Sequence, residues 1–544
     1  MDRGMDPCVG TWTDVTSDSR LVEHLLDLYF CWEYPTLASL SREHFMADFV
    51  AGRPRFCSPL LVNALLALAS RFSDRPELRT GSDPHTTGDV FFAEAQRLFW
   101  NMESHYSLTT IQAAGIMSIR QVSCGMDRES RYYAGQSVRL CVEMGLHRHH
   151  DTSGPQNDES IVQLATFWGA FALDHAWSLT AGSLPQFSQF PLFPPKITPQ
   201  DGVDNALWMP YTDDGSTLQH PCEQPSHITS VFNSFCELSE IVHKSLYTLH
   251  CPARTPNRQD LIGIYTRFLS WYNSLPEPFR LGGTFTPQVL YMHVYYHYSI
   301  ILTFRPFIEL RITNSTLLPR KICVQAADAI HGHIRSYAEL YSLRRTPSFM
   351  PYLVLMSSRL YLAVGGLSLS PEGSVSLGSG RAKAGVWANG APDDLATTLG
   401  RVQRGIDNLD DMRQCHRVAD VAWNMLRFLI EGLKAYVEIT RALQGGQGRR
   451  GEFDPHWAAL SVNQGADFFS PKPVGDGWDK IKMKAAEKGR ASTGTSPRRM
   501  LSLLQSSDAM RSALFWPSPR LPPPSIIPVT FDLEEAGFEP IEVE

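Results

Sequence analysis

Residues 107–147 read SLTTIQAAGIMSIRQVSCGMDRESRYYAGQSVRLCVEMGLH, and this stretch decides the fold. It divides into two helical segments joined by a short polar turn. Gly145 follows the second segment and suits a left-handed helix cap, and Leu146 can supply the apolar contact that often accompanies such a cap. The stretch therefore predicts a pair of consecutive helices.

Helical spacing of apolar residues continues on both sides of this pair, and no convincing alternating strand pattern appears. Residues 59–69 are apolar at nearly every position, which is typical of a helix surrounded by others. The sequence predicts an all-α fold, a large multi-helix array with irregular loop insertions and a mostly disordered C-terminal tail. The expected helices cover 21–30, 59–69, 88–103, 108–122, 130–144, 158–180, 227–249, 257–274, 287–311, 318–342, 348–367, 395–413 and 416–443.

Composition shifts along the chain predict its organisation. We expect a disordered N-terminus over 1–19, a helical domain over 20–443 and a disordered tail over 444–544. Within the helical domain, the Pro-rich segment 183–226 and the Gly, Ser and Ala-rich segment 371–392 should be irregular, mobile surface loops.

The net charge, the cysteine spacing and the distribution of apolar residues exclude several classes of protein. A formal net charge of −7 gives no overall attraction to a polyanion. Ten cysteines are scattered singly, so we expect a reducing compartment instead of a disulfide scaffold. The first residues lack the pattern of a secretory signal, and charged or histidine residues interrupt the two most apolar stretches, 287–304 and 352–369, so we expect no membrane span.

The tail has a basic part and an acidic end. Its loosely spaced basic residues are a candidate nuclear-import signal or an ordinary solvated stretch: Lys480, Lys482, Lys484, Lys488, Arg490, Arg498 and Arg499. The last 14 residues, FDLEEAGFEPIEVE, carry six acids and no base. Apolar residues among like charges, here Phe531, Leu533 and Phe538, are typical of acidic activation segments. A plain solubilising tail is the alternative.

Several short motifs resemble the fungal-specific transcription factor domain, also called the middle homology region, of binuclear zinc cluster regulators. The T-x-x-Q-A helix and the terminal G-L-H fall in the stretch quoted above, T-F-W-G follows, and other pieces are similar to the nitrate-assimilation activators. The motif residues that we single out are Gln112, Arg139, Gly145, His147, Trp168, Asp174, Arg305 and Pro306. Most of them have a structural role on physical grounds.

The resemblance implies a nuclear, non-enzymatic regulator of metabolic genes. Its expected partners are the transcription machinery, a corepressor or a DNA-binding regulator, with a small-molecule effector as a further candidate. Members of the family carry an N-terminal six-cysteine zinc cluster that holds a helix in the DNA major groove. This sequence has no C-x-x-C, so we expect no cofactor in this chain, zinc only with an upstream cluster, and DNA contact only indirectly or through such a missing module.

One departure from the family pattern concerns Asp174. Its position relative to Phe167 predicts that it points partly inward and needs a partner. The family supplies arginines just before T-F-W and in a later G-R-P, whereas this chain has Gln163-Leu164 and residues 182–185, GSLP, there. We expect Arg139 or another cation to replace them, or the neighbouring groove to have diverged.

Three alternatives compete with the regulator. His147, His149, His150 and Asp151 are metal-ligand types, but their spacing fits no established site, and we predict no metal site there. The acids in residues 407–411, DNLDD, could hold magnesium in a terpene-synthase-like enzyme, although such a run is usually a solvated helix face. A cytoplasmic interaction scaffold is the third alternative.

Overall fold

The computed structural model describes residues 12–81, 86–148, 156–189, 192–213, 223–251, 255–369, 392–444 and 533–540. The segments 1–19 and 444–544, which are predicted to be disordered, lie mostly outside these residues. So does nearly all of the predicted loop 371–392. Within the described residues no helix is long and apolar enough to cross a membrane.

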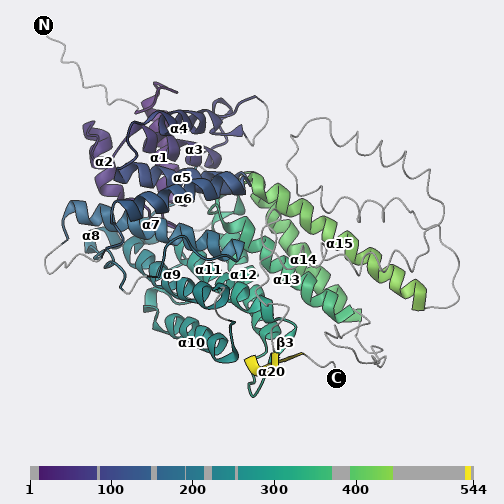
Figure 1. The fold of residues 1–544 in the computed structure, drawn as a ribbon. Helices are drawn as coiled ribbons and strands as arrows, with labels where there is room; N and C mark the ends of the chain where they lie inside the picture. Colours follow the sequence, from purple (N-terminus) through teal and green to yellow (C-terminus); the bar gives the residue numbers. More distant parts are fainter. Residues whose placement is uncertain are drawn as a thin grey trace, which may run out of the picture.

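The described residues form the predicted multi-helix array (Figure 1). Its α-helices are α1 (Ser19–Trp32), α2 (Arg42–Ala51), α3 (Pro59–Ala69), α4 (Asp89–Asn101), α5 (Leu108–Ser123), α6 (Asp127–Glu143), α7 (Asp158–Ala181), α8 (Asp201–Asp204), α9 (Ile228–His250), α10 (Arg258–Ser274), α11 (Pro287–Phe304), α12 (Pro319–Tyr341), α13 (Met350–Leu369), α14 (Pro392–Met412), α15 (Arg417–Gln444) and α20 (Leu533–Ala536). Short 3-10 helices cover Ser70–Phe72 (η1), Pro76–Leu78 (η2), Glu277–Phe279 (η4), Arg305–Phe307 (η5) and Leu343–Arg345 (η6).

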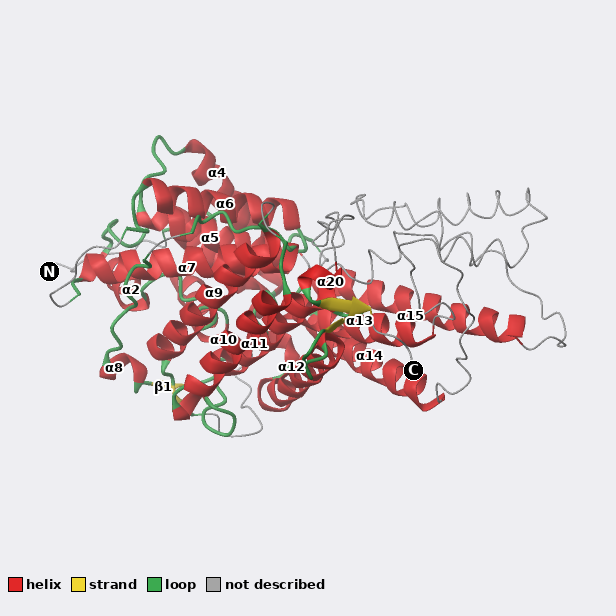
Figure 2. Cartoon of the chain, turned by 60° about the horizontal axis from the view of Figure 1, so that its bottom comes forward, coloured by secondary structure: helices red, strands yellow, loops and turns green. Residues whose placement is uncertain are grey.

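Two antiparallel strand pairs interrupt the helices. Strand β1 (Leu207–Trp208) pairs with β2 (Gln224–Pro225). Strand β3 (Leu310–Ile312) pairs with β4 (Phe538–Pro540), which comes from the far end of the chain (Figure 2). These strands are two or three residues long, too short to show an alternating pattern in the sequence.

One apolar core runs through the array. Helix α5 packs against α3, α6 and α7, α7 packs against α9, and α9 packs against α11. Helix α11 contacts α12 and α13, α13 contacts α14 and α15, and α15 returns to α5. The most enclosed element is α3, where every residue from Leu60 to Ala69 is buried, as its continuous apolar sequence predicts. Ser58 caps its first turn by accepting a hydrogen bond from Leu61 N, and Pro59 suits the first helical position.

One predicted helix is too long, and one predicted loop makes buried contacts. The expected helix over 287–311 ends at Phe304, because Pro306 has no backbone N–H and cannot continue an α-helix. The segment 183–226 is not only a surface loop. Its residue Trp208 is 8% exposed and donates to Cys31 O at 3.3 Å, and Trp32 Nε1 donates to Tyr211 O at 2.7 Å. These indole hydrogen bonds hold the segment on α1.

Candidate regulatory site

In the motif pair, α5 packs against α3 and α7, and α6 packs against α5 and α7. Ser107 caps α5 through a hydrogen bond from Thr110 N, and the turn that follows contains Gly125 at φ +70°. At the end of α6, Gly145 has φ +74° and donates to Val142 O at 3.0 Å, while Leu146 N donates to Cys141 O at 3.0 Å. Gly145 therefore forms the expected left-handed cap.

Helix α7 contacts α5 through a buried amide. Gln112 Nε2 donates to Thr166 Oγ1 at 2.8 Å, and Gln112 is 2% exposed. Next to Thr166, the buried Trp168 donates from Nε1 to Pro195 O at 3.0 Å, and Lys196 Nζ lies 4.9 Å from the centroid of the Trp168 ring. The motif residues Gln112 and Trp168 thus hold α5, α7 and the segment after α7 together.

Asp174 does not pair with Arg139. Its Oδ2 accepts hydrogen bonds from Gln186 N at 2.8 Å and Phe187 N at 3.0 Å, because the chain after α7 folds back over the helix. Burial raises the pKa of Asp174 to about 7, although these two N–H groups favour its ionised form. Arg139 instead makes an exposed ion pair with Glu143 at 2.9 Å. Of the two alternatives, the cationic partner for Asp174 is therefore wrong, because main-chain N–H groups take its place.

His147 follows the cap and is partly buried, and burial together with the neighbouring Arg148 lowers its pKa. The other members of the predicted metal-ligand cluster, His149, His150 and Asp151, lie outside the described residues. Among the residues that the structure describes, no group of three or more His, Cys, Asp or Glu side chains could hold a metal ion. Asp407, Asp410 and Asp411 lie on the exposed side of α14.

The motif residues Arg305 and Pro306 form the 3-10 turn that ends α11. Arg305 is 6% exposed, and its Nη1 approaches Met356 Sδ at 3.4 Å. Burial lowers the pKa of Arg305 to about 10 and that of Arg359, which is 1% exposed, to about 9. These two guanidinium groups lie in the interior where α11 meets α13, so Arg305 is a core residue.

Sequence reasoning missed a buried polar cluster around His416, at the start of α15. His416 Nδ1 accepts from Arg71 Nη1 at 2.9 Å and from Ser123 Oγ at 3.0 Å, and His416 Nε2 donates to Thr346 O at 3.0 Å. His416 is 0% exposed, and burial holds its pKa well below the ordinary value. Its partners are up to 345 residues away in the sequence, so no local pattern could have identified the cluster.

Glu33 extends this cluster to α1. Its carboxylate accepts from Arg71 Nη2 and, at 3.2 Å, from Ser348 N and Ser348 Oγ. Burial raises the pKa of Glu33, and the charge of Arg71 opposes that rise. The cluster ties the first helix, the segment before α13 and the start of α15 together.

A large cavity is lined by residues of α1 and of the first part of α7. It has a volume of about 810 Å³ and lies between α1, α2, α7, α9 and the segment 197–211. Apolar side chains supply much of its wall, among them Phe30, Met46, Trp208 and Phe232. Ligand pockets for small molecules usually have volumes of about 300–1,000 Å³ and mostly apolar walls, so the cavity has the size of such a pocket.

One polar group in the cavity wall lacks a partner. Gln288, from α11, is 3% exposed; its Nε2 donates to Ser226 O, whereas its Oε1 has no hydrogen-bond partner. At the rim, the Arg42 guanidinium lies 5.0 Å from the centroid of the Phe30 ring, and partial burial raises the pKa of Asp27. The cavity thus offers an apolar wall, one unused buried acceptor, and a cation and a carboxylate at its mouth.

Residues 26–277, from α1 to the start of η4, match the sequence model of the fungal specific transcription factor domain. This range contains the motif helices and nearly all of the cavity wall. Residues 26–277 of the chain therefore resemble a fungal-specific transcription factor domain. No solved structure matches the chain.

Curated relatives of this domain are transcription factors. The chain is 33% identical over 374 residues to the nitrogen assimilation transcription factor nit-4 of Neurospora crassa, a match that covers 65% of this chain and 34% of nit-4. It is also 33% identical over 375 residues to nirA of Emericella nidulans, which carries the same description, over 66% of this chain and 42% of nirA. A more distant relative is the notoamide biosynthesis transcriptional activator notL' of Aspergillus versicolor, 25% identical over 53% of this chain and 46% of that protein.

The chain spans between about a third and a half of the length of these relatives. The similarity to nit-4 and nirA agrees with the nitrate-activator-like subgroup that the motifs indicate. The matched residues run from within α1 to just past the end of α10, and helices α11 to α15 pack into the same core.

Proposed function

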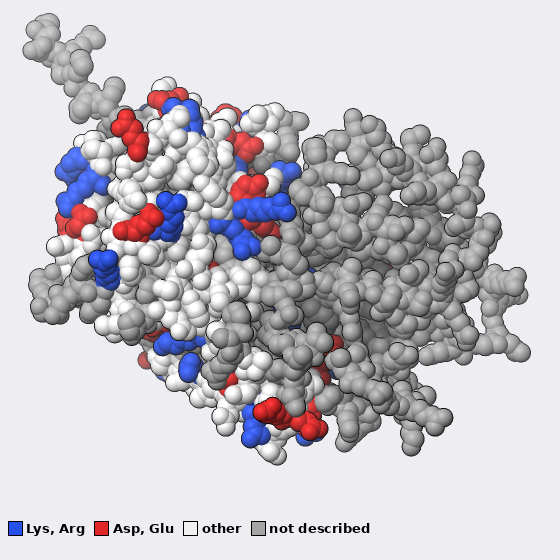
Figure 3. Space-filling model, in the orientation of Figure 1, with Lys and Arg blue, Asp and Glu red and all other residues white. Residues whose placement is uncertain are grey.

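We propose that the chain is the regulatory part of a nuclear transcription regulator of metabolic genes. The match over residues 26–277, with nit-4 and nirA as relatives, is the observation that carries this proposal. On the face in Figure 3, Lys and Arg lie among Asp and Glu and form no continuous basic surface over the described residues. We assign promoter recognition to a separate zinc-cluster segment or to a DNA-binding partner, because this sequence has no C-x-x-C.

Tethering tests the regulatory role. The full chain, fused to a heterologous DNA-binding domain in a fungal host, should change a reporter's output relative to that domain alone. An identical output with both fusions, under all nitrogen and carbon sources tried, would contradict the proposal. Imaging of the tagged chain in the same strain separates a nuclear regulator from a cytoplasmic scaffold.

The source of DNA recognition has its own test. Mapping the 5′ end of the transcript should reveal whether an in-frame exon encodes the six-cysteine cluster. If it does, zinc belongs to that segment; if it does not, the chain acts through another regulator. We also propose that the role is non-enzymatic, and turnover of a prenyl diphosphate that is lost in Asp410→Ala would contradict this.

We further propose that the 810 Å³ cavity binds a small amphipathic effector, with Gln288 Oε1 accepting a hydrogen bond from it. The amphipathic dye 1-anilinonaphthalene-8-sulfonate is a suitable probe. Its binding should weaken in Met46→Trp, which fills part of the cavity. Binding should persist in the matched variant Val50→Trp, because Val50 lies on the same helix, is 61% exposed and is not part of the cavity wall. Equal binding to both variants would contradict the assignment.

A further inference from the structure

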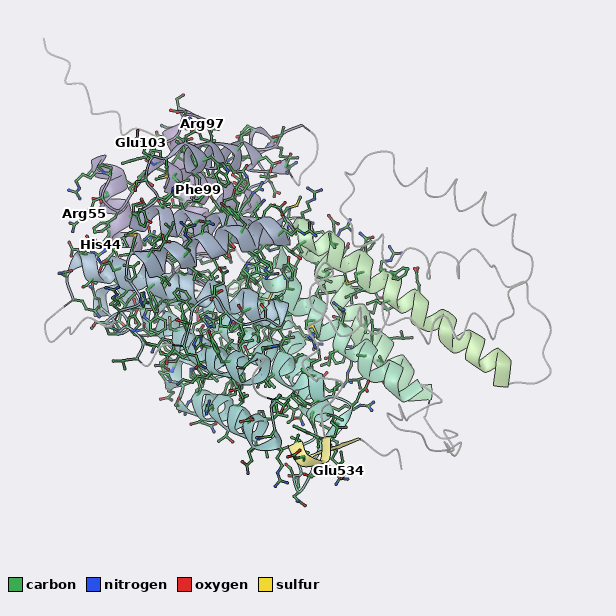
Figure 4. All side chains as sticks on the ribbon, in the orientation of Figure 1. His44, Arg55, Arg97, Phe99, Glu103 and Glu534 are labelled. Atoms are coloured by element: carbon green, nitrogen blue, oxygen red, sulfur yellow. The ribbon has the colours of Figure 1, made fainter. Side chains whose placement is uncertain are left out.

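The C-terminal segment 533–540 returns to the body of the protein. It forms the short helix α20 and the strand β4, and β4 pairs antiparallel with β3 in the register Leu310 with Pro540 and Ile312 with Phe538. Figure 2 shows the strand pair in yellow, β3 contacts α12, and Figure 4 places Glu534 at this end of the body, far from His44 and Arg55. The segment is therefore a bound peptide that belongs to the same chain.

One aromatic side chain anchors this peptide. Phe538 is 0% exposed, and its ring stacks on Phe307 with 5.0 Å between centroids and 23° between planes. Phe307 belongs to the 3-10 turn after α11, where Pro306 has ended the helix. The turn thus presents an aromatic face that the tail covers.

The peptide backbone is fixed next to this anchor. Gly537 O accepts from Thr313 N at 3.1 Å and from Thr313 Oγ1 at 3.0 Å, and Arg258 Nη1 donates to Thr313 Oγ1 at 3.1 Å. Gly537 has φ +82°, and a Cβ there would lie 2.4 Å from Arg258 Cδ. Only glycine fits this position without strain.

Charge complements the backbone pairing. Arg311, on β3, lies 3.7 Å from Glu539, on β4, and Arg258 lies beside Gly537. The exposed Arg311–Glu539 pair adds little affinity, but cations beside an acidic peptide favour its approach. Apart from the tail itself, the surface consists of the β3 edge that pairs with β4, an aromatic platform and two cations, which together fit a short, extended, acidic peptide with one aromatic residue.

We propose that β3, with Phe307, Thr313 and Arg258, is a peptide-docking surface whose occupant is residues 533–540 of the same chain, held reversibly. The contact is small, with one aromatic anchor and one three-residue strand, so opening it leaves the rest of the core intact. Docking buries Phe538, one of the apolar residues of the candidate activation segment. A partner that needs Phe538 can bind only the undocked tail. The docking itself does not depend on the role in transcription.

Hydrogen exchange of the full chain tests the docking. Gly537→Val and Phe538→Ala should each speed exchange at residues 310–313 by about tenfold or more, because both release the strand partner. Exchange in α3 and α5 should stay unchanged, which separates undocking from global unfolding. Phe285→Ala is the matched control, since it removes a phenylalanine that is 39% exposed and does not belong to the docking surface. Unchanged exchange at 310–313 in both variants would overturn the proposal.

A labelled peptide of residues 531–544 tests whether the tail docks on its own chain. It should bind full-length Phe538→Ala at least about tenfold more tightly than the wild-type chain, whose own tail occupies the surface. Equal affinity for both chains, or no binding to either, would overturn the proposal. A wild-type dimer that dissociates on Phe538→Ala substitution would also overturn it, because the tail would then dock on a second copy.

Discussion

His416 shows how single buried residues hold distant parts of this chain together. It is fully buried, accepts from Arg71 and Ser123, and donates to Thr346 O. A buried donor or acceptor that loses its partner keeps the cost of desolvation without a compensating bond. The cluster is therefore sensitive to truncation of its central ring.

His416→Ala should lower the free energy of unfolding by about 3 kcal/mol or more, since several buried polar groups lose their partner together. Urea denaturation followed by circular dichroism measures this loss. The neighbouring exposed Gln414 supplies the control: Gln414→Ala should change stability by no more than about 0.5 kcal/mol. A loss of similar size in both variants would show that the cluster has no special role.

Asp174 gives a second test at the residue scale. Asp174→Ala leaves the N–H groups of Gln186 and Phe187 without an acceptor, so we expect a loss of about 2–4 kcal/mol. Asp174→Asn keeps one acceptor oxygen and should lose less. The same urea titration compares the two, and an equal loss in both variants would mean that the negative charge, not the hydrogen bonding, matters.

At the scale of elements, α7 depends on a close approach. A Cβ at Gly169 would lie 2.4 Å from both Cα and Cβ of Ser39, so the segment after α1 packs directly on the helix backbone. A Cβ at Gly263, in α10, would have no neighbouring atom within 4 Å. Gly169 is therefore needed for the close packing of α7, whereas Gly263 only lowers the helix propensity of α10.

Gly169→Ala should destabilise the protein by about 1–3 kcal/mol, because backbone must move to admit the methyl group. Gly263→Ala should stabilise it by about 0.5–1 kcal/mol through higher helix propensity. Thermal unfolding of both variants measures the difference. Equal shifts in the melting temperature would contradict the close packing at Gly169.

The sequence predicts the longer helices well and the strands of two or three residues poorly. Helices such as α3 and α5 have enough residues for periodicity, caps and breakers to agree, and their predicted bounds differ little from the observed ones. The pairing of β3 with β4 involves three residues separated by more than 200 positions, which leaves no local signal. The cavity wall likewise combines α1, α2 and the segment 197–211, and only the folded chain brings them together.

At the scale of the whole molecule, buried histidines are a common feature. Burial lowers the pKa of His175 and His297 to about 3, and that of His243, His250, His331 and His333 to about 4. In the unfolded chain a histidine has a pKa of about 6.5. Below that pH the unfolded state binds protons that the folded state does not.

Stability should therefore fall as the pH drops from about 6.5 towards 4, by roughly 1.4 kcal/mol per pH unit for each such histidine. Asp174 acts in the opposite direction: its raised pKa, about 7, contributes stability below the unfolded value of 3.8 that is lost as the pH rises through 7. Burial also raises the pKa values of Glu33, Asp27, Glu237 and Asp411, so these carboxyls act in the same direction as Asp174. The described histidines with a lowered pKa are more numerous, so the net effect is a loss of stability in acid. Urea midpoints at pH 7.5, 6.5 and 5.5 measure it, and a constant midpoint would contradict this balance.

The docked tail also determines what a single backbone cut would release. Gln444 ends α15, and Leu533 begins the docked helix, so after a cut between these two residues no covalent bond joins the docked segment to α15. Only the β3–β4 pair and the Phe538 anchor would then retain the fragment. A nicked Gly537→Val chain should therefore lose its tail fragment faster than a nicked wild-type chain.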